Sequence, residues 1–143
     1  MDATKIRLSP KEKELLQNAG WILTKNEIVK KAKLLLEGVM EEQLSFLRSG
    51  GLSYRKEIIS VSPKISRGEN YKGLPWLILD HPRLFSKQNA FAIRTFFWWG
   101  NFFSVTMHLE GSYKGKIETS VAAAYERLKE EDIYCSVNDD PWQ

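Results

Sequence analysis

The apolar positions of this chain follow two different periods. Between residues 25 and 47 they recur at intervals of three and four, which is the spacing of one face of an α-helix. The Gly50-Gly51 pair ends this pattern. We therefore predict a long helix that ends there, with Thr24 and Glu27 forming a capping box at its start.

Shorter helices are predicted on either side of this one. Ser9, Pro10 and Glu12 form a capping box with proline at the first helical position, and Gly20 ends that helix. A third helix is predicted from Ile117 through Leu128, where apolar residues return to helical spacing.

Strand signals occupy the middle of the chain. Residues 57–62 are rich in β-branched residues, and residues 74–79 form a short apolar run between turn signals, so we predict a strand at each. The polar stretch 66–73 between them is predicted to be a loop. Residues 133–137 are predicted to return as a further strand before an exposed C-terminal tail.

The strongest strand signal is an aromatic hairpin over residues 91–109. Gly100-Asn101 predicts a two-residue turn, which pairs Trp99 with Phe102. In this register Arg94 lies on an apolar face that we expect to be the core face. The opposite face is mixed, with aromatic rings near the turn and a polar strip. The polar strip consists of Thr95, Ser104, Thr106 and His108.

Together these elements predict one α+β domain over residues 1–143. Its N-terminal part, residues 1–51, is helical, residues 52–110 form the β part, and residues 111–143 form a helix and a tail. The expected sheet is antiparallel, has about four or five strands around the hairpin, and packs against two N-terminal helices and one C-terminal helix.

The composition excludes some kinds of site and favours one cellular location. Cys135 is the only cysteine, which excludes an intramolecular disulfide and a zinc site of several thiolates. No apolar run approaches the length of a membrane span, so we expect a cytoplasmic protein that binds no membrane. Residues 1–116 carry 19 Lys and Arg against 11 Asp and Glu, whereas residues 117–143 carry 2 against 7. This acidic segment argues against nucleic-acid binding, which needs an unopposed basic surface.

Several short stretches carry a resemblance to a known group of proteins. They include Gly68-Glu-Asn-Tyr71, Gly73-Leu-Pro-Trp76, Leu79-Asp-His-Pro-Arg83, Phe91-Ala-Ile-Arg-Thr95 and Phe97-Trp-Trp-Gly-Asn-Phe-Phe-Ser104. In these stretches the chain resembles a family of small bacterial proteins of unknown function. The resemblance extends over most of the chain and implies a bacterial, intracellular setting, but it implies no activity, cofactor or site residue.

Arg94 is the most informative polar residue. A guanidinium on a core face needs a carboxylate or carbonyl partner. One interpretation is a structural ion pair with a residue such as Asp80 or Glu57; the other is an anchor for an anionic ligand. The candidate ligand-binding residues are Arg94, Thr95, Ser104, Thr106 and Arg83.

Catalytic signals are weak. Asp80, His81 and His108 are the candidates, but adjacent strand residues such as Asp80 and His81 point to opposite faces. No nucleophile elbow, phosphate loop, dinucleotide motif or metal-binding motif occurs, so we expect no cofactor and no metal.

These observations favour a non-catalytic ligand-binding or protein-interaction module that uses the mixed hairpin face and Arg94. Its expected partners are a small anionic ligand, or a second copy or another protein bound through an aromatic surface. An enzyme acting on a small anionic or polar substrate is the alternative, and weak nucleic-acid binding is the third hypothesis. What covers the mixed face of the hairpin separates these hypotheses.

Overall fold

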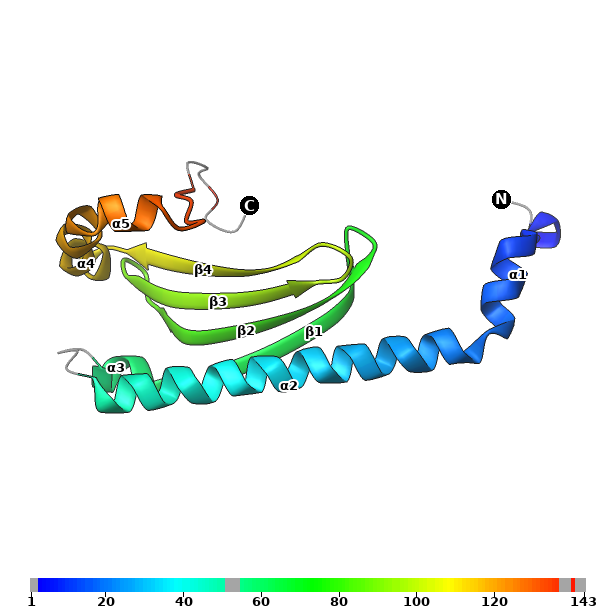
Figure 1. Cartoon of the computed structure of the whole chain (residues 1–143), viewed down its shortest axis with the longest axis horizontal. Helices are drawn as coiled ribbons and strands as arrows, with labels where there is room; N and C mark the ends of the chain where they lie inside the picture. Colours follow the sequence, from blue (N-terminus) through cyan, green and yellow to red (C-terminus); the bar gives the residue numbers. More distant parts are fainter. Residues whose placement is uncertain (1–2, 51–54, 137–139, 141–143) are drawn as a thin grey trace.

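The computed structural model describes residues 3–50, 55–136 and 140, and it confirms the α+β class (Figure 1). Its strands form one antiparallel sheet in the order β1-β2-β3-β4. The elements in chain order are η1 (Ala3–Lys5), α1 (Pro10–Gln17), α2 (Ala19–Ser49), α3 (Arg55–Ser60), β1 (Lys64–Tyr71), β2 (Leu74–Phe85), β3 (Ala90–Trp98), β4 (Phe102–Glu110), α4 (Ser112–Ala123) and α5 (Tyr125–Lys129).

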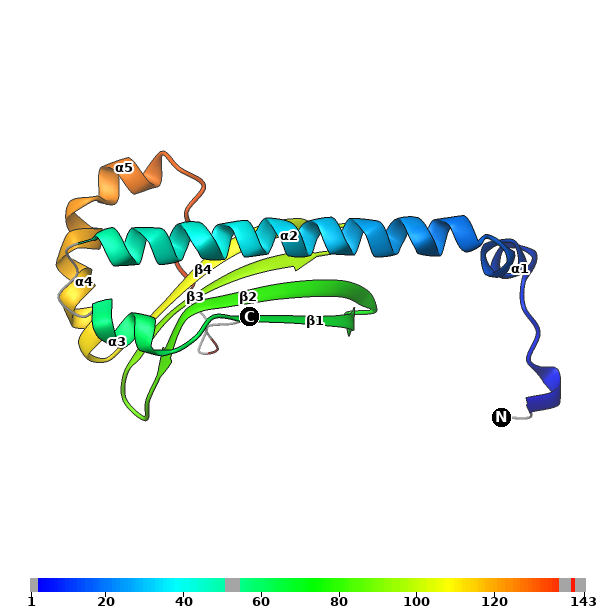
Figure 2. The same ribbon diagram turned by 90° about the horizontal axis from the view of Figure 1, so that it is seen from below.

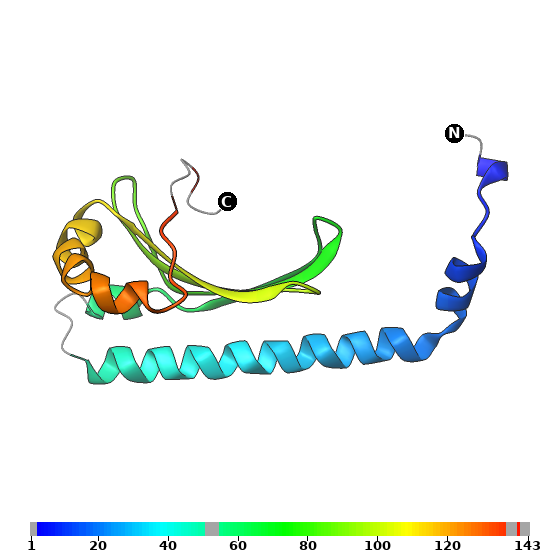
Figure 3. The same cartoon turned by 45° about the horizontal axis from the view of Figure 1, so that its top comes forward.

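The long helix α2 lies across one face of the sheet (Figure 2). The sheet is curved, and its convex face is turned towards α2 while its concave face is turned away (Figure 3). On the convex face, Ala32 and Leu36 of α2 form a buried cluster with Leu77 and Leu79 of β2. Alternate residues of β2 therefore face α2, and the residues between them lie on the concave face.

A second buried cluster closes one end of the sheet. Leu47 of α2, Ile58 of α3, Phe91 of β3 and Tyr113 of α4 pack together there. At the other end, α1 and the N-terminal part of α2 extend beyond the sheet (Figure 1). The core thus lies between α2 and the convex face, and α3 and α4 contribute to it at one end.

The start of α1 is confirmed, but that of α2 is not. Ser9 Oγ accepts a hydrogen bond from the Glu12 N–H, and the Glu12 carboxylate accepts one from the Ser9 N–H, which completes the capping box. The predicted start of the long helix at Thr24 is wrong, because α2 already begins at Ala19. The Asn18 side chain caps it by accepting from the Trp21 N–H at 3.3 Å. The end before Gly50 is confirmed.

Three other predicted segments are corrected. The strand predicted at residues 57–62 is wrong: α3 forms there instead, because a helix lets Ile58 pack on Leu47 in the buried cluster. The loop predicted at residues 66–73 is largely strand β1, whose side chains are mostly exposed. Residues 133–136 form no strand, and Val137 and most of the predicted tail lie outside the described residues.

The hairpin of β3 and β4 is confirmed, but its predicted register is off by one residue. Trp98 pairs with Phe102, which leaves Trp99, Gly100 and Asn101 in the turn. The Asn101 N–H donates to the Trp98 carbonyl at 3.0 Å, and Gly100 has a φ of 71°. A turn with its third residue at positive φ favours glycine there, which accounts for the longer turn.

The shift changes which side chains share a face. Arg94 was expected on the core face and lies instead on the concave face, opposite Thr106. Phe103, Val105 and Met107, which were expected on the core face, lie on the convex face, and α2 covers that face only in part. None of the described helices has the length and apolar character that crossing a membrane requires.

Candidate functional site

The concave face is the candidate site because its aromatic rings and polar groups converge on a surface that none of the described helices covers (Figure 3). Three cross-strand pairs of β2 and β3 form its centre. They are Trp76 with Trp98, Ile78 with Phe96, and Asp80 with Arg94. Going from the hairpin turn towards the middle of the sheet, the face therefore changes from aromatic to charged.

The aromatic part is a continuous cluster of rings. Trp98 packs nearly parallel to Phe96, with ring centroids 6.5 Å apart, and edge-on against Phe102 at 5.7 Å. Tyr71 of β1 packs edge-on against both Phe96 and Trp98, at 5.6 and 5.1 Å. The Trp98 indole N–H donates to the Tyr71 carbonyl at 3.2 Å. Ring-to-ring packing of this kind holds the cluster as one rigid surface.

Local sequence explains how Tyr71 and Trp76 reach this surface. Lys72 and Gly73 both have positive φ and make the tight turn between β1 and β2, and Asn70 Oδ1 accepts from the Gly73 N–H at 3.0 Å. Gly68 lies opposite Trp76, where a Cβ would come within 2.6 Å of the indole ring. The absence of a side chain at Gly68 therefore makes room for Trp76.

The charged part is a two-point ion pair. Arg94 Nε donates to Asp80 Oδ1 at 2.7 Å, and Arg94 Nη2 donates to Asp80 Oδ2 at 3.0 Å. The side chains are partly buried, with 31% of Arg94 and 19% of Asp80 exposed. A paired guanidinium and carboxylate present both donors and acceptors with little net charge. The structure thus shows the structural ion pair with Asp80 that the sequence left as one of two interpretations.

Most of the predicted ligand-binding residues gather around this pair. Ser104 and Thr106 of β4 lie opposite Phe96 and Arg94 on the concave face. Arg83 lies on the same face beyond an irregularity in β2, and its Nε donates to the Ser62 carbonyl at 2.7 Å.

Thr95 is the exception among them. It lies on the convex face opposite Leu79, is buried, and its hydroxyl has no hydrogen-bond partner among the described residues. It therefore does not join the candidate site.

The three predicted catalytic candidates are not brought together. Asp80 is paired with Arg94 on the concave face, whereas His81 is fully buried and follows Asp80 onto the other side of the strand. His108 lies further along the concave face, opposite Ala92, with its Nε2 3.6 Å from a Glu110 carboxylate oxygen. Burial lowers the pKa of His81, because a charged imidazole loses its hydration there. No cluster of metal-ligating side chains occurs within the described part of the chain.

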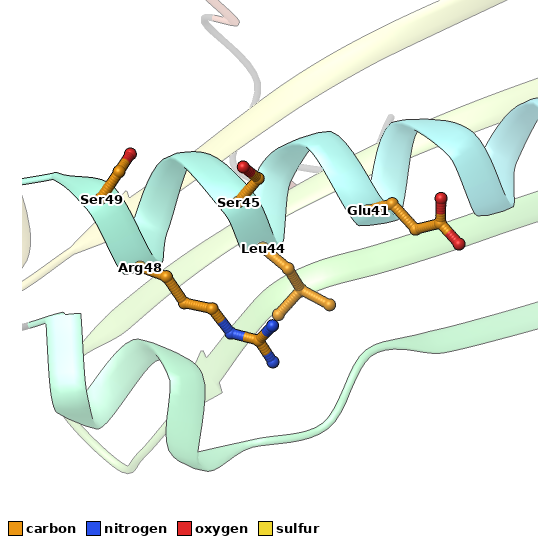
Figure 4. Close-up of a pocket in the computed structure, with 5 residues that line it drawn as sticks. All are labelled: Glu41, Leu44, Ser45, Arg48 and Ser49. Atoms are coloured by element: carbon orange, nitrogen blue, oxygen red, sulfur yellow. The ribbon is translucent and has the colours of Figure 1, made fainter.

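Two hollows lie away from the concave face. One, of about 520 Å³, is bordered by side chains of α2 alone, and these include Leu44, Ser45 and Arg48 (Figure 4). The other, of about 310 Å³, lies between α3, the β2–β3 turn and the start of α4. At this second hollow the Tyr113 hydroxyl donates to the Glu57 carboxylate at 2.6 Å, so two of its polar groups already hold the helices together.

Sequence reasoning missed Tyr71, Trp76 and Gly68 as parts of the site. Residues 66–71 read as a polar loop because β1 is an edge strand with little apolar alternation. The alternation in Leu74 to Asp80 was a signal for Trp76, because Trp76, Ile78 and Asp80 share one side of a strand. Comparison with family models, with curated proteins and with solved structures finds no match to this chain.

Proposed function

We propose that this protein is a non-catalytic binding module whose ligand lies on the concave face of the sheet. The observation that carries the proposal is the floor of packed rings, Tyr71, Phe96, Trp98 and Phe102, on a curved face beside the Asp80–Arg94 pair. Rigid aromatic surface next to a few fixed polar groups is the usual make-up of a ligand site.

The same arrangement indicates the ligand class. The rings favour a flat apolar or aromatic body, and the Ser104 and Thr106 hydroxyls next to Arg94 favour a polar or anionic group attached to it. Asp80 already neutralises Arg94, so affinity comes mainly from the rings and less from charge. A cytoplasmic, bacterial setting remains our expectation from the sequence.

An enzyme is the less favoured reading. Asp80, His81 and His108 would have to meet at one reacting atom, and they lie on two faces of the sheet and at separate positions along it. We therefore do not assign these residues a catalytic role.

The test uses anilinonaphthalene sulfonate, a fluorescent probe that has aromatic rings and one sulfonate. Phe102 and Phe103 offer a matched pair of variants, because they are neighbours on β4, are 52% and 49% exposed, and lie on opposite faces. Phe102→Ser is expected to raise the probe's dissociation constant about tenfold, the loss of roughly 1.4 kcal/mol of ring contact. Phe103→Ser is expected to leave it nearly unchanged.

Circular dichroism and thermal unfolding of both variants check that each remains folded. Equal effects of the two substitutions, or a larger effect of Phe103→Ser, would show that the probe does not bind at the concave face and would refute the proposal.

A further inference from the structure

One flank of α2 carries a row of large apolar side chains that the described structure leaves exposed. Trp21, Ile28 and Leu35 recur every seven residues and are 41%, 42% and 54% exposed. A seven-residue repeat keeps side chains on one side of a helix, and it is typical of helices that pack along one another. The row therefore fits a second helix lying beside α2.

This flank is turned away from α3. In Figure 4, Leu44 and Arg48 point from α2 towards α3, whereas Ser45 and Ser49 point to the other side. Gly38 precedes Ser45 by two helical turns and so lies on the same side as Ser45. The sheet-facing residues Ala32 and Leu36 lie between the two flanks.

Gly38, on the same flank, is a second indication that another helix packs there. Glycine costs about 1 kcal/mol relative to alanine inside a helix. A Cβ at Gly38 would meet no atom within 4 Å, so nothing in the described part of the chain requires a glycine there. A glycine allows close approach by another helix, because the missing side chain leaves a notch into which a neighbouring side chain fits.

We propose that α2 packs antiparallel against α2 of a second copy of this chain along this flank. A two-fold axis between residues 36 and 37 sets Leu35 of each copy against the notch at Gly38 of the other. The same axis sets Ile28 against Ser45 and Lys31 against Glu42. Each contact occurs twice, as an isologous interface requires.

The distribution of charge along α2 indicates that the helix packed against it is α2 of a second copy in the antiparallel orientation. The N-terminal half of α2 is basic on its exposed sides and the C-terminal half is acidic. On the flank with Leu35 and Gly38 these charges are Lys31 in the first half and Glu42 in the second. Antiparallel pairing brings opposite charges together, whereas parallel pairing would set like charges side by side.

The convex face adds apolar area next to the helix row. Phe103, Val105 and Met107 of β4 lie on that face and are about half exposed or more. With Ile28 and Leu35 they offer roughly 500 Å² of apolar surface per copy, so two copies approach the roughly 1,000 Å² that a stable interface needs.

The first test fills the notch. Light scattering on the full chain is expected to give twice the monomer mass of 16.6 kDa. Gly38→Leu should shift the protein to the monomer, although leucine favours the helix and the new side chain meets open space within the chain. Gly115→Leu in α4, where a Cβ also meets open space, is the control and should leave the dimer intact.

The second test reverses charges to establish that the partner is a second copy and that the two helices are antiparallel. Lys31→Glu and Glu42→Lys should each raise the dimer dissociation constant about tenfold, because each sets like charges together twice. The double variant should restore the wild-type value. Lys30→Glu and Glu41→Lys lie towards the other flank and should change it little.

A monomer at millimolar concentration, or a dimer that neither Gly38→Leu nor the charge reversals weaken, would overturn this proposal.

Discussion

Arg94 shows what residue chemistry predicts and where it stops. The need of a guanidinium for a carboxylate follows from its charge, and Asp80 was one of the partners named from the sequence. The face of the sheet on which the pair lies could not be predicted from residue types, because it depends on the hairpin register. A turn one residue longer than expected moves Arg94 from the convex to the concave face. Arg94, Ser104 and Thr106 meet on that face for the same reason.

Replacing Arg94 tests the structural part of its role. Arg94→Met leaves the partly buried Asp80 carboxylate without its two-point partner, so we expect the free energy of unfolding to fall by about 1–2 kcal/mol. Adding Asp80→Asn should recover part of the loss, since the unpaired charge is then removed. Urea denaturation measures both changes. A variant Arg94→Met as stable as the wild type would contradict the assignment.

His81 gives stability a dependence on pH. Its ring nitrogens are buried without a hydrogen-bond partner among the described residues, and burial lowers its pKa below the ordinary value of 6.5. The unfolded chain therefore takes up a proton at higher pH than the folded one does. The contribution of neutral His81 is complete above pH 6.5 and is lost as the pH falls through its lowered pKa.

The comparison is between wild type and His81→Leu, with unfolding by urea followed from pH 7.5 down to about pH 5. The wild type should lose stability below pH 6.5, and the variant should lose less over the same range. Parallel curves for the two proteins would show that His81 does not cause the decline.

At the scale of elements, most strong local signals were predictive, but the capping box predicted at Thr24 was not, because α2 already begins at Ala19. The capping box of α1, the glycine end of α2 and the aromatic strands β3 and β4 carry their own information. The short elements α3 and β1 carry no such local signal. The helix α3 forms in a stretch rich in β-branched residues because Ile58 is buried against Leu47, and β1 is mostly exposed at a sheet edge. Tertiary contacts decided both.

The β1–β2 pairing can be tested at Gly68. In Gly68→Ala the new Cβ would come within 2.6 Å of the Trp76 indole, so either the ring or the strand must move. We expect a loss of about 1–3 kcal/mol in unfolding free energy and a shift in tryptophan fluorescence. The control Gly115→Ala lies in a helix with open space at its Cβ and should stabilise slightly. Two glycines that respond alike would contradict the close packing of Trp76 on β1.

For the whole molecule, sequence patterns gave the α+β class but not the layering. Helical and strand periods predict which elements form, whereas the side of the sheet that α2 covers depends on long-range contacts such as those of Leu36 with Leu77 and Leu79. The extension of α1 and the start of α2 beyond the sheet was also not foreseen, because an exposed apolar helix has the same spacing as a buried one (Figure 1).

The placement of α2 on the convex face has a consequence for how the proposed ligand would be held. A dimer joined through α2 leaves both concave faces free of the partner's helix, since each lies on the side of its sheet away from α2 (Figure 3). Such an assembly is bivalent. A target that displays the ligand at two points would then be retained much longer than a single site allows, because release of one site leaves the other attached.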